Sequence, residues 1–223
     1  LEGTKVEAVV EVMPYLAGLT RNKVQCLEDF DIPLYMEHTI VRIKGEKRVE
    51  GVTVAKVDEQ RNPVSGTEFD IDCDTVLFSV GLIPENELSK AAGIEMDRIT
   101  AGPIVDNNMQ TMTEGIFACG NVLHVNDLAD NVSKESAHAG RAAAKYAMAA
   151  DHAERKDVEV VAGRNVRYVV PHKIDLNSDD DFVQIYFRVQ TPEKKVKIRA
   201  DIDGKEVSGA NRAFVNPGEI ESV

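Results

Sequence analysis

The N-terminal third of the chain combines short apolar runs with one alternating stretch. Residues 6–10 and 75–80 are nearly continuous apolar runs, the pattern of parallel strands that are buried on both faces. Residues 39–71 alternate apolar and polar side chains around two polar breaks, which predicts a three-stranded antiparallel meander. Apolar spacing predicts an amphipathic helix over residues 19–30, and residues 32–35 resemble a further short strand.

Turn residues and alanine organise the middle of the chain. Gly81 and a nearby proline end the second apolar run, and residues 86–92 are expected to form a short helix. Residues 104–119 predict two short strands, and residues 133–150 predict a helix dense in alanine. Within that helix, Gly140 predicts the close approach of a neighbouring strand or ligand.

Beyond about residue 151 the pattern changes to short alternating strands. Strands are predicted at residues 158–162, 166–170, 182–189 and 196–202, followed by an Asp203-Gly204 hairpin turn of type I′. Residues 151–223 are therefore expected to form a small, β-rich, sandwich-like C-terminal domain.

Composition narrows the classes of protein to which the chain can belong. Its 223 residues can bury a real core, and no apolar run reaches the length of about 18 residues that spans a membrane. The formal net charge of −12 argues against nucleic acid as a partner, because the phosphates would be repelled. No secretory signal is present, so a cytoplasmic protein is predicted.

Cys26, Cys73 and Cys119 lie far apart in the sequence. No C-x-x-C pair and no metal-spaced cluster of histidine and cysteine occurs, so neither a dithiol centre nor a metal site is predicted. All three side chains are expected to be reduced thiols of the core.

The segment TEGIFACGN at residues 113–121 carries the clearest chemical signal. A short apolar strand that ends in Gly120 lets a ligand approach bare backbone, and Asn121 then offers an amide to that ligand. We expect a flat or phosphate-bearing ligand at this tip.

Three segments carry a resemblance to a known family: residues 74–85 (DTVLFSVGLIPE), 105–121 and 133–148. They resemble the C-terminal half of the pyridine nucleotide-disulfide oxidoreductases of the thioredoxin reductase-like type, flavoproteins with two dinucleotide-binding domains. Over residues 6–146 the chain is most similar to the NAD/FAD-dependent dehydrogenases that include the FAD subunits of opine oxidase and hydrogen cyanide synthase.

The resemblance implies an α/β chain with a partial Rossmann-like fold, in which the meander is an insert of the nicotinamide domain. Residues 1–84 would be the second half of the NAD-binding domain, and residues 85–150 the C-terminal part of the FAD-binding domain. The implied cofactors are FAD and NAD, and hydride transfer through the flavin is favoured over thiol–disulfide chemistry.

The implied flavin site lies at the tip and at the helix that follows it. The family usually has Gly-Asp where this chain has Gly120 and Asn121, and an amide can still bond the ribityl hydroxyls of FAD. Ser133, Lys134 and Glu135 would start a helix whose positive end faces the flavin. A plain turn and a surface helix cap are the alternative interpretations.

The implied nicotinamide site rests on two residues. Glu11 ends a strand where a carboxylate can bond the adenosine ribose hydroxyls, which favours NAD over NADP because a 2′-phosphate would be repelled. Gly81 would admit the nicotinamide end of the cofactor. A solvated acid and a turn glycine are the alternatives.

No catalytic residue is assigned from sequence. His124 follows the tip closely enough to act as a general acid or base, and His138 is a weaker candidate, but a lone histidine is more often structural.

The glycine turns that hold both pyrophosphates in such enzymes, G-x-G-x-x-G, do not occur among the fifteen glycines. The chain also begins with Leu1. We therefore expect a fragment of a longer enzyme that is inactive alone and lacks both cofactors.

The competing hypothesis is a non-catalytic scaffold or partner-docking module of a multi-subunit dehydrogenase. The parent enzyme would act on a small-molecule substrate, with a partner subunit or a second copy of the chain as a possible neighbour.

Overall fold

The computed structural model describes residues 3–16, 18, 20–151, 154–178 and 180–223. The chain forms two compact units, Leu1–Val80 and Gly81–Val223, here called the N-terminal and C-terminal units. Each is described by itself. The predicted division into domains at residues 84 and 150 stays a prediction.

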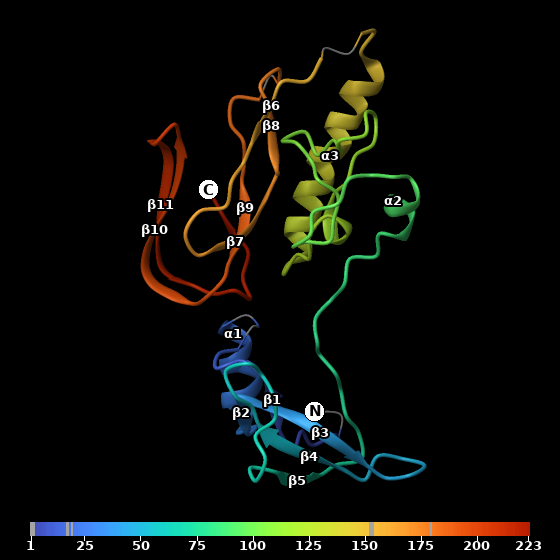
Figure 1. Ribbon diagram of the computed structural model, residues 1–223, viewed down its shortest axis with the longest axis vertical. Helices are drawn as coiled ribbons and strands as arrows, with labels where there is room; N and C mark the ends of the chain where they lie inside the picture. Colours follow the sequence, from blue (N-terminus) through green and yellow to red (C-terminus); the bar gives the residue numbers. More distant parts are fainter. Residues whose placement is uncertain (1–2, 17, 19, 152–153, 179) are drawn as a thin grey trace. The chain divides into compact units, whose positions relative to one another are not determined.

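The N-terminal unit contains one parallel strand pair and one antiparallel sheet (Figure 1). Strand β1 (Val9–Glu11) pairs in parallel with β2 (Leu34–Met36). Three short helical turns connect them: α1 (Thr20–Asn22), the π-helical η1 (Lys23–Leu27) and the 3₁₀ turn η2 (Glu28–Phe30). The predicted helix over 19–30 is thus broken into turns, and its predicted residue Leu19 lies outside the described residues.

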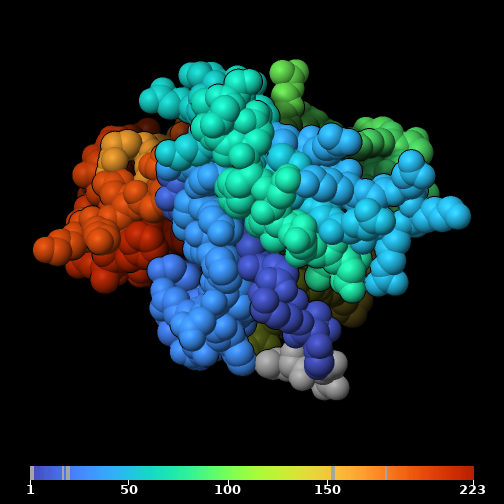
Figure 2. Space-filling view, turned by 90° about the horizontal axis from the view of Figure 1, so that it is seen from below, coloured from blue at the N-terminus to red at the C-terminus, as the bar shows by residue number. Residues whose placement is uncertain are grey.

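The predicted meander is confirmed. Strands β3 (His38–Lys44), β4 (Gly51–Lys56) and β5 (Phe69–Asp72) form an antiparallel sheet in that order. The central strand β4 supplies the core of this unit, with Val54 and Ala55 fully buried. In Figure 2 the loop between β3 and β4, in light blue, projects from the surface of the unit.

The predicted strand over residues 75–80 is wrong. These residues adopt no regular structure, and Leu77 and Val80 are 90% and 88% exposed. A strand of this kind needs a neighbour on at least one edge for its backbone groups. Among the described residues, no strand pairs with this segment.

The C-terminal unit is built around one long helix and three small sheets (Figure 1). The predicted short helix is confirmed as α2 (Glu87–Ala91), and the alanine-rich helix is α3 (Ala129–Met148). Two strands were predicted over residues 104–119. The structure has only isolated β-bridges there, between Val105 and Thr111 and between Gln110 and Phe117.

The sheets of this unit follow α3 in sequence. Strands β7 (Val166–Val170), β9 (Tyr186–Val189) and β12 (Glu221–Ser222) form one sheet in the order β12-β9-β7. The other two sheets are the pairs β6 (Asp157–Glu159) with β8 (Lys173–Asp175), and β10 (Glu193–Ile202) with β11 (Lys205–Val215). One core contains residues from the tip region, α3 and β7: Val105, Met109, Ala118, Leu123, Ala139, Tyr168 and Val170.

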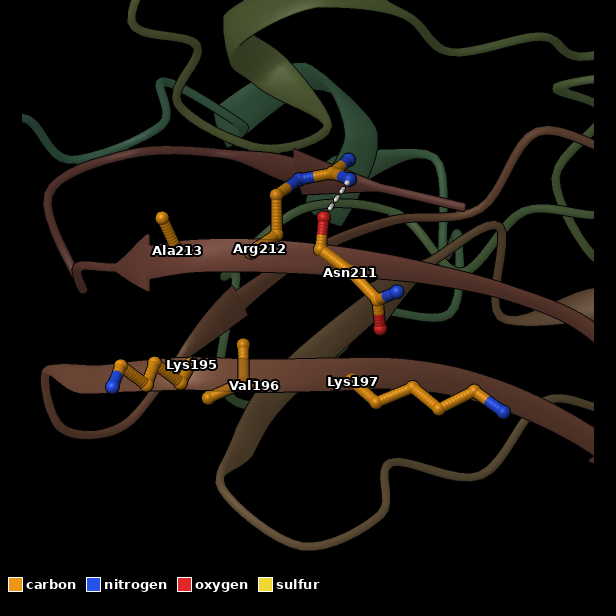
Figure 3. A pocket seen from close by; sticks show the side chains of 6 residues that line it. All are labelled: Lys195, Val196, Lys197, Asn211, Arg212 and Ala213. Carbon is orange, nitrogen blue, oxygen red and sulfur yellow. Dashed lines mark hydrogen bonds between the residues drawn. The ribbon is translucent and has the colours of Figure 1, made fainter.

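The predicted hairpin turn joins β10 and β11. Asp203 and Gly204 have φ values of 50° and 77°, as a type I′ turn requires. The hairpin carries an open hollow of about 410 Å³ (Figure 3). Lys195 and Lys197 point along the strand in opposite directions there, so their ammonium groups do not converge on a common point.

Gly140 lies on the exposed side of α3. The expectation of a neighbouring strand is wrong, because a Cβ built at this position meets nothing within 4 Å, and the expectation of a ligand there stays a prediction. Gly140→Ala is therefore expected to raise the stability of the C-terminal unit by about 0.5–1 kcal/mol, since alanine loses less backbone entropy in a helix. Urea unfolding followed by circular dichroism at the helical band measures this change, and a loss of stability would contradict it.

Candidate functional site

The tip predicted from sequence forms a tight turn that only glycine suits. Cys119 is extended, and η3 (Gly120–Val122) starts directly after it. Gly120 is buried with φ of +72°, and a Cβ there would lie 3.3 Å from Val132 Cγ1. Asn121 is exposed beside it, and its Oδ1 accepts a bond from the Asn126 N–H at 3.0 Å. The Asn121 NH₂ group can donate to a ligand oxygen.

A buried carboxylate holds this turn from the side of α3. Glu135 Oε2 accepts a bond from the Gly120 N–H at 2.6 Å, and Oε1 lies 3.0 Å from His124 Nε2. The two side chains are only 1% (His124) and 2% (Glu135) exposed. One carboxylate thus ties both ends of the 120–124 turn to the helix.

The predicted start of α3 is wrong by four residues. The helix begins at Ala129, with the Leu128 carbonyl accepting from Asn131, and Asp130 favourably charged in the first turn. Ser133, Lys134 and Glu135 consequently lie in the second turn, where their N–H groups are not at the helix end. Ser133 and Lys134 are exposed. Their part in cofactor binding stays a prediction, and the helix-end argument for it no longer applies.

Two residues that were not predicted from sequence contact the 120–124 turn. Asn86 is 1% exposed, and its Nδ2 donates to the carbonyls of Ala101 and Val122 at 2.9 and 2.6 Å. Gly102 packs so closely that an added Cβ would lie 1.8 Å from the Leu123 carbonyl oxygen. The only signals of these roles in the sequence are the turn at Pro84, which Asn86 follows, and the pair formed by Gly102 and Pro103.

Arg188 of β9 holds residues 125–127, the segment that follows the tip. Arg188 donates to Asp127 Oδ1 at 2.5 Å and to the Val125 carbonyl at 2.9 Å. The other Asp127 oxygen accepts from the Ile220 N–H at 2.6 Å. Residues of the predicted C-terminal β domain therefore fix the chain next to the candidate site.

His124 is enclosed rather than open to a ligand. The rings of Tyr168 and Tyr186 lie 6.0 and 6.2 Å from its ring, and burial raises the pKa of both tyrosines. His124 Nδ1 is buried without a hydrogen-bond partner among the described residues. This geometry gives His124 a structural role at the turn and offers no path to an exposed reactant.

His138 and His172 form bonds away from the tip. His138 Nε2 lies 2.6 Å from the Asn107 carbonyl, a bond inside the unit. His172 accepts from the Val105 N–H at 3.2 Å, and burial lowers the pKa of this imidazole. Among the described residues, neither imidazole forms a hydrogen bond with Gly120 or Asn121.

The two predicted nicotinamide residues lie in separate units. Glu11 ends β1 as predicted, and its Oε1 accepts from the Met13 N–H at 2.9 Å, which leaves the second oxygen for a ligand. Gly81 is exposed with φ of +97° and has open space where a Cβ would be. The binding roles of both residues stay predictions.

The thiols and possible metal ligands add no further site. All three cysteines are free, and Cys26 is exposed, so its prediction as a core thiol is wrong. Cys73 and Cys119 are half-buried. Within the described ranges, no group of three or more histidine, cysteine or acidic side chains could hold a metal ion. No described helix is both long and apolar enough to span a bilayer.

Comparison with known proteins links the chain to one family. The model of the pyridine nucleotide-disulphide oxidoreductases matches residues 4–144. The nitric oxide reductase FlRd-NAD(+) reductase of Escherichia coli O139:H28 is 29% identical over 85 residues, which are 38% of this chain and 20% of that protein. The probable ferredoxin reductase CtmF of Castellaniella defragrans is 31% identical over 83 residues, covering 35% of this chain and 20% of that protein.

A solved structure is similar over a longer range. The thioredoxin reductase of T. acidophilum superimposes with a TM-score of 0.55 and 26% identity, over 64% of this chain and 45% of that one. The matches to the two reductases of the preceding paragraph are shorter and span about a fifth of those proteins' length.

Proposed function

The chain belongs to the pyridine nucleotide-disulphide oxidoreductase family, and from this premise we propose that its Gly120–Asn121 tip binds FAD in an oxidoreductase that moves hydride between a nicotinamide and the flavin. The family and the α/β, partial two-dinucleotide-domain fold predicted from sequence are confirmed. The observation that carries the functional proposal is the tip itself, a buried left-handed glycine followed by an exposed amide.

The residues at the tip fit the sugar-alcohol and diphosphate part of FAD. Gly120 is buried and its N–H is bonded to Glu135, so it would shape the turn that presents Asn121 to the ligand rather than contact the ligand itself. The Asn121 NH₂ can donate to a ribityl hydroxyl or a phosphate oxygen without adding negative charge beside the diphosphate. When bound, the flavin would supply the hydride-accepting ring.

The surrounding residues would keep this tip rigid. Glu135 fixes the Gly120 N–H, Asn86 fixes the Val122 carbonyl, and Arg188 fixes the segment that follows. A preorganised turn loses little entropy when a ligand binds, so these groups would strengthen binding without touching FAD. In the N-terminal unit, Glu11 would accept bonds from the adenosine ribose of NAD, as the resemblance implies. The role of Gly81 toward the nicotinamide stays a prediction.

Titration of the chain with FAD tests the proposal. The 223 residues contain no G-x-G-x-x-G turn, so weak binding is expected, and the titration should extend to FAD concentrations on the order of millimolar. Asn121→Leu should weaken binding about tenfold, because it removes a donor to a charged or hydroxyl oxygen. Quenching of flavin fluorescence measures the affinity.

Two further variants separate the chemistry of Asn121 from damage to the turn. Asn121→Asp keeps the acceptor for the Asn126 N–H, and its carboxylate, the acid usual in the family, can accept a bond from a ribityl hydroxyl, so it should still bind FAD. Asn62→Leu, in an exposed loop of the N-terminal unit, should bind like the unchanged chain. The proposal fails if no saturable quenching occurs, or if Asn121→Leu binds FAD as well as the unchanged chain does.

A further inference from the structure

Residues 75–83 leave a run of apolar side chains uncovered. Figure 1 draws this segment, between β5 and α2, as a trace without helix or strand. Five of its side chains are at least 65% exposed: Leu77, Phe78, Val80, Leu82 and Ile83. Contiguous apolar surface of this kind on a folded protein marks a site of contact with another molecule.

The backbone of the same segment is also unpaired. Within the described part of the chain, no backbone–backbone hydrogen bond and no β-bridge involves residues 75–83. Their sequence, TVLFSVGLI, has the composition of a strand. Such a segment adds readily to another strand, because main-chain hydrogen bonds and the burial of side chains are gained together.

The charge of the segment favours a second copy of the chain as the occupant. Residues 75–83 contain no charged side chain, although the whole chain has a formal net charge of −12. Two copies therefore repel each other over most of their surface, but not along this segment. A symmetric dimer needs a patch that complements itself, and an uncharged apolar strand does so about a two-fold axis.

Antiparallel pairing about a two-fold axis at Phe78 uses the segment best. Gly81, with φ of +97°, ends the stretch that can be extended, so Phe78 is the middle of residues 75–81. In this register Phe78 lies opposite its own copy, and Val76 lies opposite Val80 of the other copy. These three side chains share one face of the pair, where aromatic and β-branched neighbours stabilise a sheet.

The apolar area is sufficient for a weak dimer. Burial of one such side chain removes about 60–120 Å² from water. The five exposed side chains of each copy thus supply about 600–1,200 Å² in total, to which the paired backbone adds. Specific complexes bury at least about 1,000 Å². A dissociation constant on the order of 10 μM is therefore expected.

We propose that residues 75–83 are the contact of a homodimer, in which the two segments pair as antiparallel strands about Phe78. The proposal goes beyond the flavin site and does not depend on it.

Sedimentation equilibrium of the 223-residue chain tests this contact from about 1 μM to about 500 μM. The average mass should rise from that of one chain to a plateau at twice that value. The dimer should also become tighter as salt is raised from about 0.05 M to about 0.5 M, since salt screens the repulsion between two acidic chains and leaves the apolar contact intact.

Two variants place a charge in the contact. Phe78→Lys and Val80→Lys should each weaken the dimer at least about tenfold, and at position 78 the two like charges would meet on the axis. Phe182→Lys and Val161→Lys are the matched controls, because these side chains are similarly exposed, at 79% and 77%, and lie in the C-terminal unit. Both controls should associate like the unchanged chain. Circular dichroism at the helical band checks that all four variants are folded.

Several results would overturn the proposal. A single-chain mass at every concentration would leave the edge of another protein's sheet as the occupant. A mass that passes twice that of the chain without a plateau would show non-specific aggregation. Dimers that weaken as salt is raised would join through charged surfaces, and a dimer that survives both Phe78→Lys and Val80→Lys would use another face. The mass and salt series on the unchanged chain decide the matter even if a variant does not fold.

Discussion

Replacing Gly102 with alanine is expected to destabilise the C-terminal unit by more than about 4 kcal/mol, enough to unfold it under ordinary conditions. The added Cβ would lie 1.8 Å from the Leu123 carbonyl oxygen and 2.5 Å from its carbonyl carbon. These atoms belong to the backbone, so no side-chain rotation relieves the overlap. Leu123 is itself fully buried, which prevents the turn from moving outward without loss of core packing.

Gly163 provides the matched control for this change. A Cβ at Gly163 meets nothing within 4 Å, and its φ is not in the left-handed region. Gly163→Ala should therefore leave stability unchanged or raise it by up to about 1 kcal/mol. Circular dichroism at the helical band follows α3 during urea unfolding, and a Gly102→Ala variant with an unchanged midpoint would contradict the close packing described above.

Local signals in the sequence predicted local structure well. The alternating pattern of residues 39–71 predicted the β3–β4–β5 meander. The Asp203-Gly204 pair predicted the hairpin turn between β10 and β11. Both depend on short-range turn chemistry and on one buried face. Gly120 was predicted as a point where a ligand meets bare backbone, with a plain turn as the alternative, and the structure shows a turn with φ of +72° there.

Features that depend on distant neighbours could not be predicted in this way. The apolar run at 75–80 has a strand's composition, but a strand also needs an edge to pair with, and sequence does not reveal which edge is present. Gly140 was expected to have a close neighbour and has none within 4 Å, whereas Gly102 was not singled out and lies against the Leu123 backbone. Nothing in the residues next to a glycine distinguishes these two cases.

The turn at Gly120 and Asn121 was singled out from sequence, but the contacts that hold it were not. Glu135 was identified through its backbone N–H at a helix end, whereas in the structure its buried side chain holds the turn. Glu135 and His124 are eleven residues apart in the sequence. They meet because α3 starts at Ala129, which places Glu135 in its second turn. An error of one turn in that start was enough to hide the pair.

Replacing Glu135 with leucine is expected to destabilise the C-terminal unit by about 3–5 kcal/mol. Leucine fits the volume, but it leaves the Gly120 N–H and His124 Nε2 buried without partners. Each orphaned group costs about 1–3 kcal/mol, and the two losses occur in one turn. Urea unfolding followed at the helical band measures the change, as for Gly102.

A graded series distinguishes the hydrogen bonds from simple packing at this position. Glu135→Gln keeps one oxygen for the Gly120 N–H and places an NH₂ beside His124, whose ring can accept in its other tautomer, so it should cost only about 1 kcal/mol. Lys134→Leu, at the exposed neighbouring position, should change stability by less than about 0.5 kcal/mol. If glutamine and leucine at 135 were equally destabilising, the carboxylate would act through its charge rather than through the two bonds. If neither lowered stability, the 120–124 turn would be held by Asn86, Gly102 and Arg188 alone.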